Sequence, residues 1–218
     1  MSMDGRFIRK LSDELNNRIG NGRINKIYQL SKSDFLFMVR SSTKNESLYL
    51  SLSPQIARLH LTNFSYDKPQ TPSGFCMLLR KYLENGQIKL IEALNEDRII
   101  QISIENSNDF GEKVIYLAII ELMGKHGNLI ITDSNKIIID CYKHVSPFEG
   151  QQRTFLKGFK YELPEDGKLS PLDNEKIREI QDLLNNRESS VTVNKDVSSL
   201  SPKKKTEFPY HAPLPDKR

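Results

Sequence analysis

The feature that most constrains the fold is a series of short apolar runs separated by a few polar turn residues. Runs of this length are typical of β-strands, and connections this short favour antiparallel neighbours. One run, Phe35 to Val39, is apolar on both faces, which predicts a central, covered strand. The expected strands span residues 23–30, 34–40, 46–52 and 58–61, followed by 87–94, 99–104, 114–122, 128–132 and 136–142. The sequence therefore predicts an α+β fold of strand-rich antiparallel sheets in two halves.

Two stretches have helical rather than strand periodicity. Near the N-terminus, apolar residues recur at helical spacing: Phe7, Ile8, Leu11, Leu15 and Ile19. Ser2 or Asp4 is placed to cap the start of this N-terminal helix, and a glycine follows Ile19 to end it. The second stretch, residues 74–83, is so densely apolar that we expect a buried central helix, from which Arg80 extends towards solvent or a phosphate.

Composition and length indicate the class of protein and its division into domains. The 218 residues, of which 37% are hydrophobic and 28% charged, suit one well-formed core plus an appendage. We expect a domain over residues 1–165, a linker with a charged helix over 166–188, and a disordered basic tail over 189–218. The charged N-terminus lacks the apolar run of a signal peptide, and no stretch is long enough to span a bilayer. These features predict a cytoplasmic protein. Cys76 and Cys141, in apolar surroundings, are expected to be buried free thiols.

Asp97 and Arg98 lie side by side between two expected strands, at the tip of a hairpin. A charged pair in this position is either a solvated turn or a site where an acceptor and a five-donor fork are held for a polar ligand. The residues alone leave both interpretations open.

The segment from Met123 to Gly127 places two glycines around Lys125 and His126. The glycines allow a sharp bend whose exposed amides bind an anion, or a simple β-turn. His126 has no second histidine, cysteine or carboxylate at metal-ligand spacing, so it is interpreted as structural or RNA-contacting. The chain also lacks a Gly-rich phosphate loop, a Ser-His-Asp order and paired carboxylates. We therefore expect neither an enzyme nor a bound cofactor or metal.

Basic residues are concentrated in two stretches, residues 6–26 and 143–160. Both are candidate phosphate-contacting surfaces, although a solvated basic face has the same composition. The net charge of +4 permits a nucleic-acid partner without requiring one. The possible RNA contacts are Arg23, Lys26, Arg58, Arg80, Lys125, His126, Lys143, His144 and Arg153.

Several short blocks together carry a resemblance to a known family. They are Met3-Asp4-Gly5, residues 22–29, 57–62 and 75–81, Asp97-Arg98, and residues 121–124 and 143–147. In order and spacing they resemble the N-terminal domain of the NFACT family, ribosome quality-control factors that are also known as fibronectin- or fibrinogen-binding proteins. The resemblance implies a factor that binds the large ribosomal subunit carrying an obstructed peptidyl-tRNA, engages a tRNA, and supports untemplated C-terminal tailing of the stalled chain. It also implies that Asp97 and Arg98 are the tRNA-binding signature and that Asp4 belongs with them.

The chain departs from the family pattern in three places. Lys125 and Gly127 stand where relatives commonly have Arg and Ser, and Lys157 replaces a usual proline. Lysine lacks the planar fork with which arginine stacks or binds bidentately. The helix-hairpin-helix, coiled-coil and C-terminal domains of full-length relatives do not fit into residues 165–218. We expect such a chain to bind tRNA or the ribosomal subunit even if those domains are required for tailing.

Two alternative functions stay open. The older family name implies an adhesin for fibronectin or fibrinogen, but unpaired cysteines and the lack of an export signal suit a reducing compartment better. The family's domain also resembles in fold the N-terminal domain of formamidopyrimidine-type DNA glycosylases, which implies a nucleic-acid-binding relative. Those enzymes attack with an N-terminal proline followed by glutamate, whereas this chain begins Met1-Ser2-Met3, so we expect no glycosylase activity.

Overall fold

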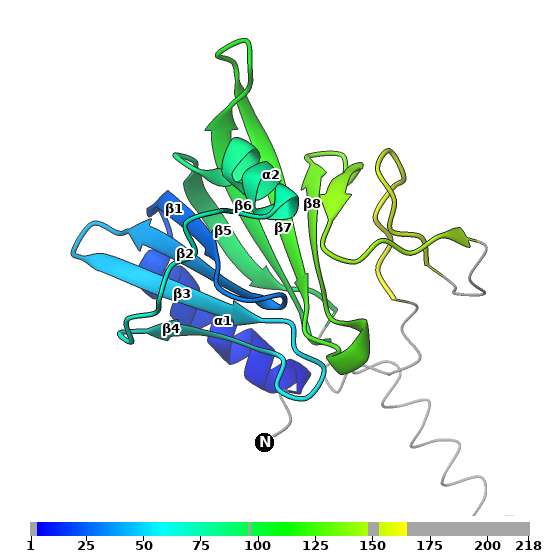
Figure 1. The fold of residues 1–218 in the computed structure, drawn as a ribbon, viewed down its shortest axis with the longest axis horizontal. Coiled ribbons are helices and arrows are strands. Elements are labelled where there is room, and N and C mark those ends of the chain that lie inside the picture. The colour runs from blue at the N-terminus through cyan, green and yellow to red at the C-terminus, as the bar shows by residue number, and fades with distance from the viewer. Residues whose placement is uncertain (1–3, 96, 148–152, 165–218) are drawn as a thin grey trace, which may run out of the picture. The chain divides into compact units, whose positions relative to one another are not determined.

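The strands of this chain form one antiparallel sheet. The computed structural model describes residues 4–95, 97–147 and 153–164 (Figure 1), which all belong to one compact unit, Met1–Ser170. Within the described residues the sheet has nine strands in the order β4-β3-β2-β1-β5-β6-β7-β8-β9. Their bounds are β1 (Arg23–Gln29), β2 (Asp34–Arg40), β3 (Asn45–Ser51), β4 (Arg58–Thr62), β5 (Gln87–Ala93), β6 (Ile99–Ser107), β7 (Lys113–Glu121), β8 (Asn128–Asp133) and β9 (Ile138–Cys141). Each strand predicted from the sequence is confirmed, as is the mostly antiparallel α+β fold.

Two strand ends differ from the prediction by more than one residue. β6 extends to Ser107, past the expected end at residue 104, because Ser107 still pairs with Lys113 in the long hairpin with β7. β9 begins at Ile138 rather than at residue 136, because Lys136 adopts a left-handed φ of 64° and its N–H donates to the Asp133 carbonyl at 3.1 Å. Lys136 therefore belongs to the turn.

The two predicted halves of the sheet meet at a short junction between β1 and β5. The registered pair is Arg23 with Gln87, and Ile24 adds backbone hydrogen bonds to Gly86 (2.9 Å) and Asn85 (2.7 Å). Gly86 is required at this close approach, since a Cβ there would lie 2.5 Å from the Ile104 side chain. The halves are therefore joined into one sheet, and β1 separates from β5 beyond this junction.

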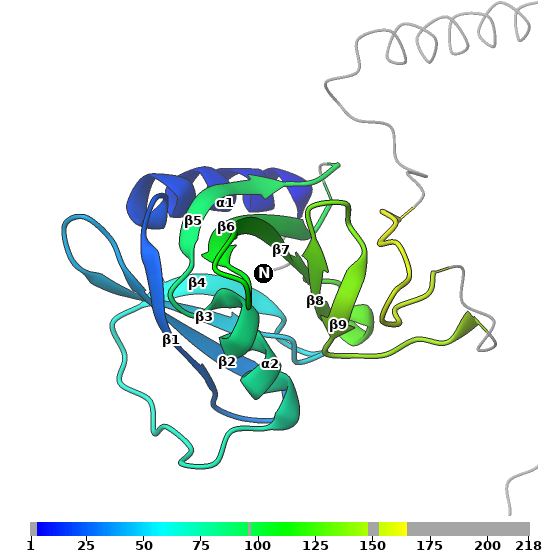
Figure 2. The same cartoon turned by 90° about the horizontal axis from the view of Figure 1, so that it is seen from above.

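Helix α1 (Gly5–Ile19) is capped as the sequence predicts. The Asp4 carboxylate accepts a hydrogen bond from the Phe7 N–H at 2.8 Å, which satisfies one of the free amides at the helix start. The apolar residues after Phe7 in the predicted stripe are buried, and the helix packs against β5 and β6 (Figure 2). Phe7 itself is 44% exposed, so it lies outside the buried stripe.

Helix α2 (Gly74–Leu83) packs against β1 and β6, on the core side of the sheet junction (Figure 2). Its N-cap is Ser73, whose hydroxyl accepts from the Cys76 N–H at 3.1 Å. The prediction of a buried central helix holds for one face only. Cys76 and Leu79 are buried, whereas Met77 is 53% exposed on the opposite face.

The core has one main cluster, which both helices and both halves of the sheet form together. A smaller cluster lies between β7, β8, β9 and the segment that carries Phe155 and Tyr161. Cys76 and Cys141 are buried and free, as predicted. No helix within the described ranges is long and apolar enough to cross a membrane. The linker helix and basic tail predicted for residues 166–188 and 189–218 lie outside the described residues.

Candidate nucleic-acid interface

Asp97 and Arg98 form the tip of the β5–β6 hairpin, as the sequence predicts. The turn is closed by the Leu94 N–H, which donates to the Ile99 carbonyl at 3.0 Å, and by the Asp97 N–H, which donates to the Leu94 carbonyl at 3.1 Å. Asn95 adopts the left-handed φ of 52° that the turn requires. The Asp97 carboxylate accepts from the Arg98 N–H at 2.7 Å. The backbone of the pair is therefore held by several hydrogen bonds and is rigid for a loop.

The Arg98 side chain is half-buried, and its guanidinium makes no hydrogen bond or ion pair with any of the described residues. Its carbonyl accepts from the Leu122 N–H at 2.8 Å, which connects the tip to the end of β7. One oxygen of Asp97 holds the turn, and the other has no hydrogen bond within the described chain. An acceptor and a fork of five donors thus lie next to each other on a fixed backbone.

The short helix η1 (Gly124–His126) follows β7 at the same end of the sheet. Its Lys125 and His126 side chains are exposed. The amides of His126 and Gly127 are already bonded to the Met123 and Gly124 carbonyls, at 3.1 and 2.9 Å, so the segment fits the turn interpretation better than the anion-cradle one.

Lys143 reaches this segment from the end of β9. Its ammonium donates to the Lys125 carbonyl at 3.0 Å, and its backbone is fixed by hydrogen bonds in both directions with the Asn128 side chain. Burial lowers the pKa of the Lys143 amine. His144 is exposed, and its Nε2 lies 2.7 Å from the Asp140 carboxylate.

Arg153 is occupied by a network that the sequence did not reveal. Its guanidinium pairs with both carboxylate oxygens of Glu121, which is 1% exposed, and lies 4.7 Å from the Phe155 ring centroid. The Tyr161 hydroxyl donates to the same carboxylate at 2.8 Å, and burial with the Glu121 charge raises the pKa of Tyr161. The signal in the sequence is one acidic residue, Glu121, at the end of an apolar strand. Its partners lie too far along the chain to be deduced.

Asp4 lies at the same end of the molecule as the hairpin tip. At the C-terminal end of α1 the Asn21 N–H donates to the Ile88 carbonyl at 3.0 Å, and one helix turn earlier Asn16 accepts from Ile91 at 3.1 Å. Helix and strand therefore run in opposite directions, so the start of α1 lies beside the end of β5. In Figure 1 both the start of α1 and the short helix η1 are at the lower end of the domain.

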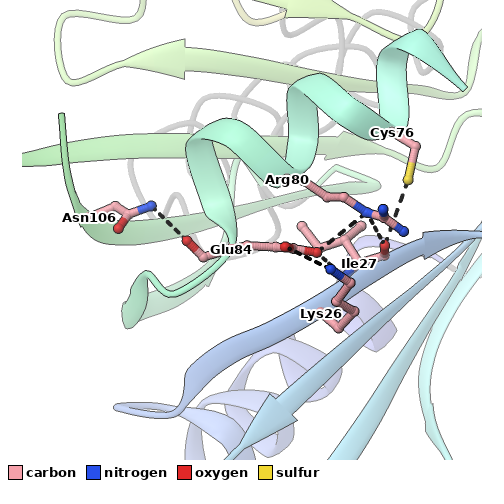
Figure 3. A network of polar contacts seen from close by, with 6 residues as sticks. All are labelled: Lys26, Ile27, Cys76, Arg80, Glu84 and Asn106. Carbon is pink, nitrogen blue, oxygen red and sulfur yellow. Dashed lines mark hydrogen bonds and ion pairs between the residues drawn. The ribbon is translucent and has the colours of Figure 1, made fainter. Parts of the chain in front are cut away.

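The other possible RNA contacts lie on β1, β4 and α2. Arg23 stands at the start of β1 and donates to the Asn85 carbonyl at 3.1 Å. Lys26 and Arg80 both contact the Glu84 carboxylate (Figure 3), with nitrogen–oxygen distances of 3.4 Å. The Arg58 guanidinium lies 5.3 Å from the Tyr49 ring centroid, and its Nε is buried with no hydrogen-bond partner among the described atoms.

One group has metal-ligating side chains close together although the sequence spacing did not indicate a metal site. Ligand atoms of Asp140, Cys141 and His144 lie within 4.8 Å of one another. However, the Cys141 thiol donates to the Phe155 carbonyl at 3.3 Å, and burial raises its pKa to about 12. Metals bind the thiolate, so a metal here would have to displace the proton that Cys141 donates to the Phe155 carbonyl.

Comparison with known proteins identifies the family. Residues 4–217 match the family model of the NFACT N-terminal and middle domains. The chain is 43% identical over 175 residues to the Rqc2 homolog RqcH of Bacillus subtilis, covering 79% of this chain and 31% of that protein. It is 37% identical to the RqcH of Streptococcus pneumoniae, covering 83% of this chain and 33% of that protein. The chain thus spans about a third of the length of these relatives.

A solved structure has the same fold. It is the N-terminal part of the fibronectin/fibrinogen-binding protein from Streptococcus suis, with a TM-score of 0.77 and 36% identity, covering 82% of this chain and 68% of that one. The sequence match and the structural match fall on the same domain. Because the family model covers nearly all of its residues, this chain belongs to the NFACT family.

Proposed function

We propose that this chain acts in ribosome quality control and that Asp97 and Arg98 form its contact with tRNA. The names of its relatives, Rqc2 homolog RqcH among them, support the process. The observation that carries the site is the Arg98 guanidinium, which has no partner among the described residues although its backbone is fixed. By contrast, the guanidinium of Arg153 is committed to Glu121.

The chemistry of the pair suits folded RNA. Arg98 can form a fork onto a phosphate or stack on an unpaired base, while Asp97 accepts from a base edge or a 2′-hydroxyl. Lys125 and His126 are exposed at the same end, where Lys125 adds a favourable charge and His126 adds a further hydrogen-bonding group. Asp4 contributes by fixing the start of α1, and its exposed carboxylate is a further acceptor.

The wider role follows from the family. In this proposal the chain binds the large ribosomal subunit that carries an obstructed peptidyl-tRNA and supports untemplated C-terminal tailing. It acts in the cytoplasm by binding, without a catalytic group or cofactor of its own.

The test is crosslinking and sequencing of the RNA bound to the chain in cells, comparing wild type with the double variant Asp97→Ala, Arg98→Ala. We expect enrichment of one tRNA and of large-subunit rRNA that the double variant loses. The variant should stay folded with a loss of about 1 kcal/mol, because the Asp97 carboxylate accepts one hydrogen bond within the turn.

A matched control removes the same two charges from the other end of β6. Glu112 and Lys113 are exposed at the β6–β7 hairpin, so Glu112→Ala with Lys113→Ala should retain the RNA. If both double variants lose it equally, the assignment to Asp97 and Arg98 is wrong. If the Asp97/Arg98 variant unfolds, the pair is structural.

One observation favours a second function. The solved relative from Streptococcus suis is described as fibronectin/fibrinogen-binding. If the wild-type chain recovers no RNA above background, immobilised fibronectin and fibrinogen should be tested for binding to the same protein. The third reading, a non-catalytic nucleic-acid-binding relative of DNA glycosylases, stays a prediction.

A further inference from the structure

A pocket far from the Asp97–Arg98 tip has the lining of a nucleotide site. It opens on β1, β2 and β3 beside the loop that follows β4, and its volume is about 240 Å³. The lining residues are Asn25, Lys26, Tyr28, Met38, Val39, Asn45 and Lys68. Pockets for drug-sized ligands measure about 300–1,000 Å³, so this one suits a single small unit. Its walls combine an aromatic ring, apolar side chains, two amides and two ammonium groups.

Two positively charged side chains lie over the ring of Tyr28. The Lys68 ammonium lies 5.2 Å from the ring centroid, and the Arg80 guanidinium lies 5.6 Å from it. Cations at this distance are attracted to the aromatic ring, so the Tyr28 ring and the two positive charges form one cluster. A ligand that fits there has a flat aromatic part and a negative group.

Glu84 fixes two of the cations (Figure 3). It follows the last turn of α2, and its Oε1 accepts from the Ile27 N–H at 2.8 Å, on the edge of β1 that β5 leaves free. The same carboxylate contacts Lys26, and Arg80 also donates to the Ile27 carbonyl at 2.9 Å. Lys26 and Arg80 share the Glu84 carboxylate, whereas Lys68 forms no ion pair with any of the described residues. The cations beside Tyr28 therefore outnumber this carboxylate.

We propose that this pocket binds one unpaired nucleotide of an RNA chain. The base packs on Tyr28 and Met38, the amides of Asn25 and Asn45 read its edge, and Lys68 with Lys26 binds the adjacent phosphate. Base stacking on aromatic rings next to cationic side chains is a general mode of single-strand recognition. The proposal rests on the proposed function in that its ligand is RNA.

The pocket is a second site and not an extension of the tip. Arg23, close to the pocket on β1, pairs with Gln87 at the start of β5, whereas Asp97 and Arg98 follow the end of that strand. An RNA that occupies both sites must extend along the sheet. The two sites are therefore separable by mutation.

The experiment titrates AMP, and separately a short single-stranded RNA, into the isotope-labelled chain and follows the backbone and side-chain amide resonances by NMR. We expect shifts concentrated at Asn25, Tyr28 and Asn45. Tyr28→Ala should weaken binding about tenfold through loss of stacking. Lys68→Ala should weaken it and reduce its salt dependence. Tyr28→Phe should bind as wild type.

Two controls separate this proposal from the proposed function. Lys32→Ala removes an exposed lysine outside the pocket lining and should change nothing. The Asp97→Ala, Arg98→Ala variant should bind AMP as wild type does while losing tRNA. If that variant keeps tRNA but Tyr28→Ala loses AMP, the tip assignment fails and the pocket stands. If AMP shifts no pocket resonance, or if Tyr28→Ala and Lys68→Ala both bind it normally, the pocket proposal is overturned.

Discussion

Glu121 shows how a single buried carboxylate organises its surroundings. Glu121 pairs in the sheet with Ile99, the first residue after the Asp97–Arg98 tip. Its carboxylate binds Arg153 and Tyr161, which lie on a segment far along the chain. The network thereby ties residues 153–161 to the strand end that supports the tip. A buried charge is tolerated only while its partners are present.

We therefore expect Arg153→Ala to lower the free energy of unfolding by about 3–5 kcal/mol, because it leaves the Glu121 charge buried and unpaired. Urea denaturation measures the change. Arg40→Ala, which removes an exposed arginine, should cost no more than about 0.5 kcal/mol. A second substitution, Glu121→Met in the Arg153→Ala background, should recover part of the loss. Equal stability of the Arg153 and Arg40 variants would contradict a structural role for the network.

At the scale of elements, the capping role of Asp4 can be separated from its proposed contact with tRNA. Asp4 caps α1 through the Phe7 N–H, and we propose that it acts beside Asp97 and Arg98 in binding tRNA. Asp4→Ala should cost about 1 kcal/mol of stability, whereas Asp4→Asn keeps a good capping oxygen and should cost little. Thermal unfolding measures both. Loss of tRNA crosslinking in the stable Asp4→Asn variant is the result expected of an RNA contact, and unchanged crosslinking would assign Asp4 to the helix alone.

An element could be predicted from the sequence where the residues that define it lie close together in the chain. Alternating apolar residues and turn residues define each strand within a few positions, and the cap of α1 lies three residues from the amide it satisfies. The position of Asp97 and Arg98 at a hairpin tip was predictable for the same reason. Exposure of Phe7 and Met77 was not, because their hydrophobicity fits the helical stripe and only packing decides which face is covered.

The partners of distant charges could not be predicted. Glu84 binds Lys26 across 58 residues, and Glu121 binds Arg153 across 32. Such pairs depend on strand order and on the junction where β1 leaves β5, which no local pattern specifies. The pocket around Tyr28 could not be predicted for the same reason, because Lys68 and Arg80 reach the Tyr28 ring from separate elements.

At the scale of the whole molecule, the two thiols are buried in different clusters of the core. Cys76 lies in the main cluster and its Sγ is 3.7 Å from the Ile27 carbonyl, while Cys141 lies in the smaller cluster against Phe155. Burial raises the pKa of Cys76 and raises that of Cys141 to about 12. The packing around each thiol therefore disfavours its thiolate form.

This burial makes the stability of the domain depend on alkaline pH. In the unfolded chain the Cys141 thiol ionises at its ordinary pKa of 9.0, and in the folded chain at about 12. Its contribution to stability is therefore fully present below pH 9 and is lost as the pH rises from 9 towards 12. We expect the free energy of unfolding, measured in urea, to fall by about 1.4 kcal/mol per pH unit on account of Cys141 in this window. The fall between pH 8 and about pH 10 should be smaller in Cys141→Ala, and an unchanged fall would mean that the thiol ionises equally in both states.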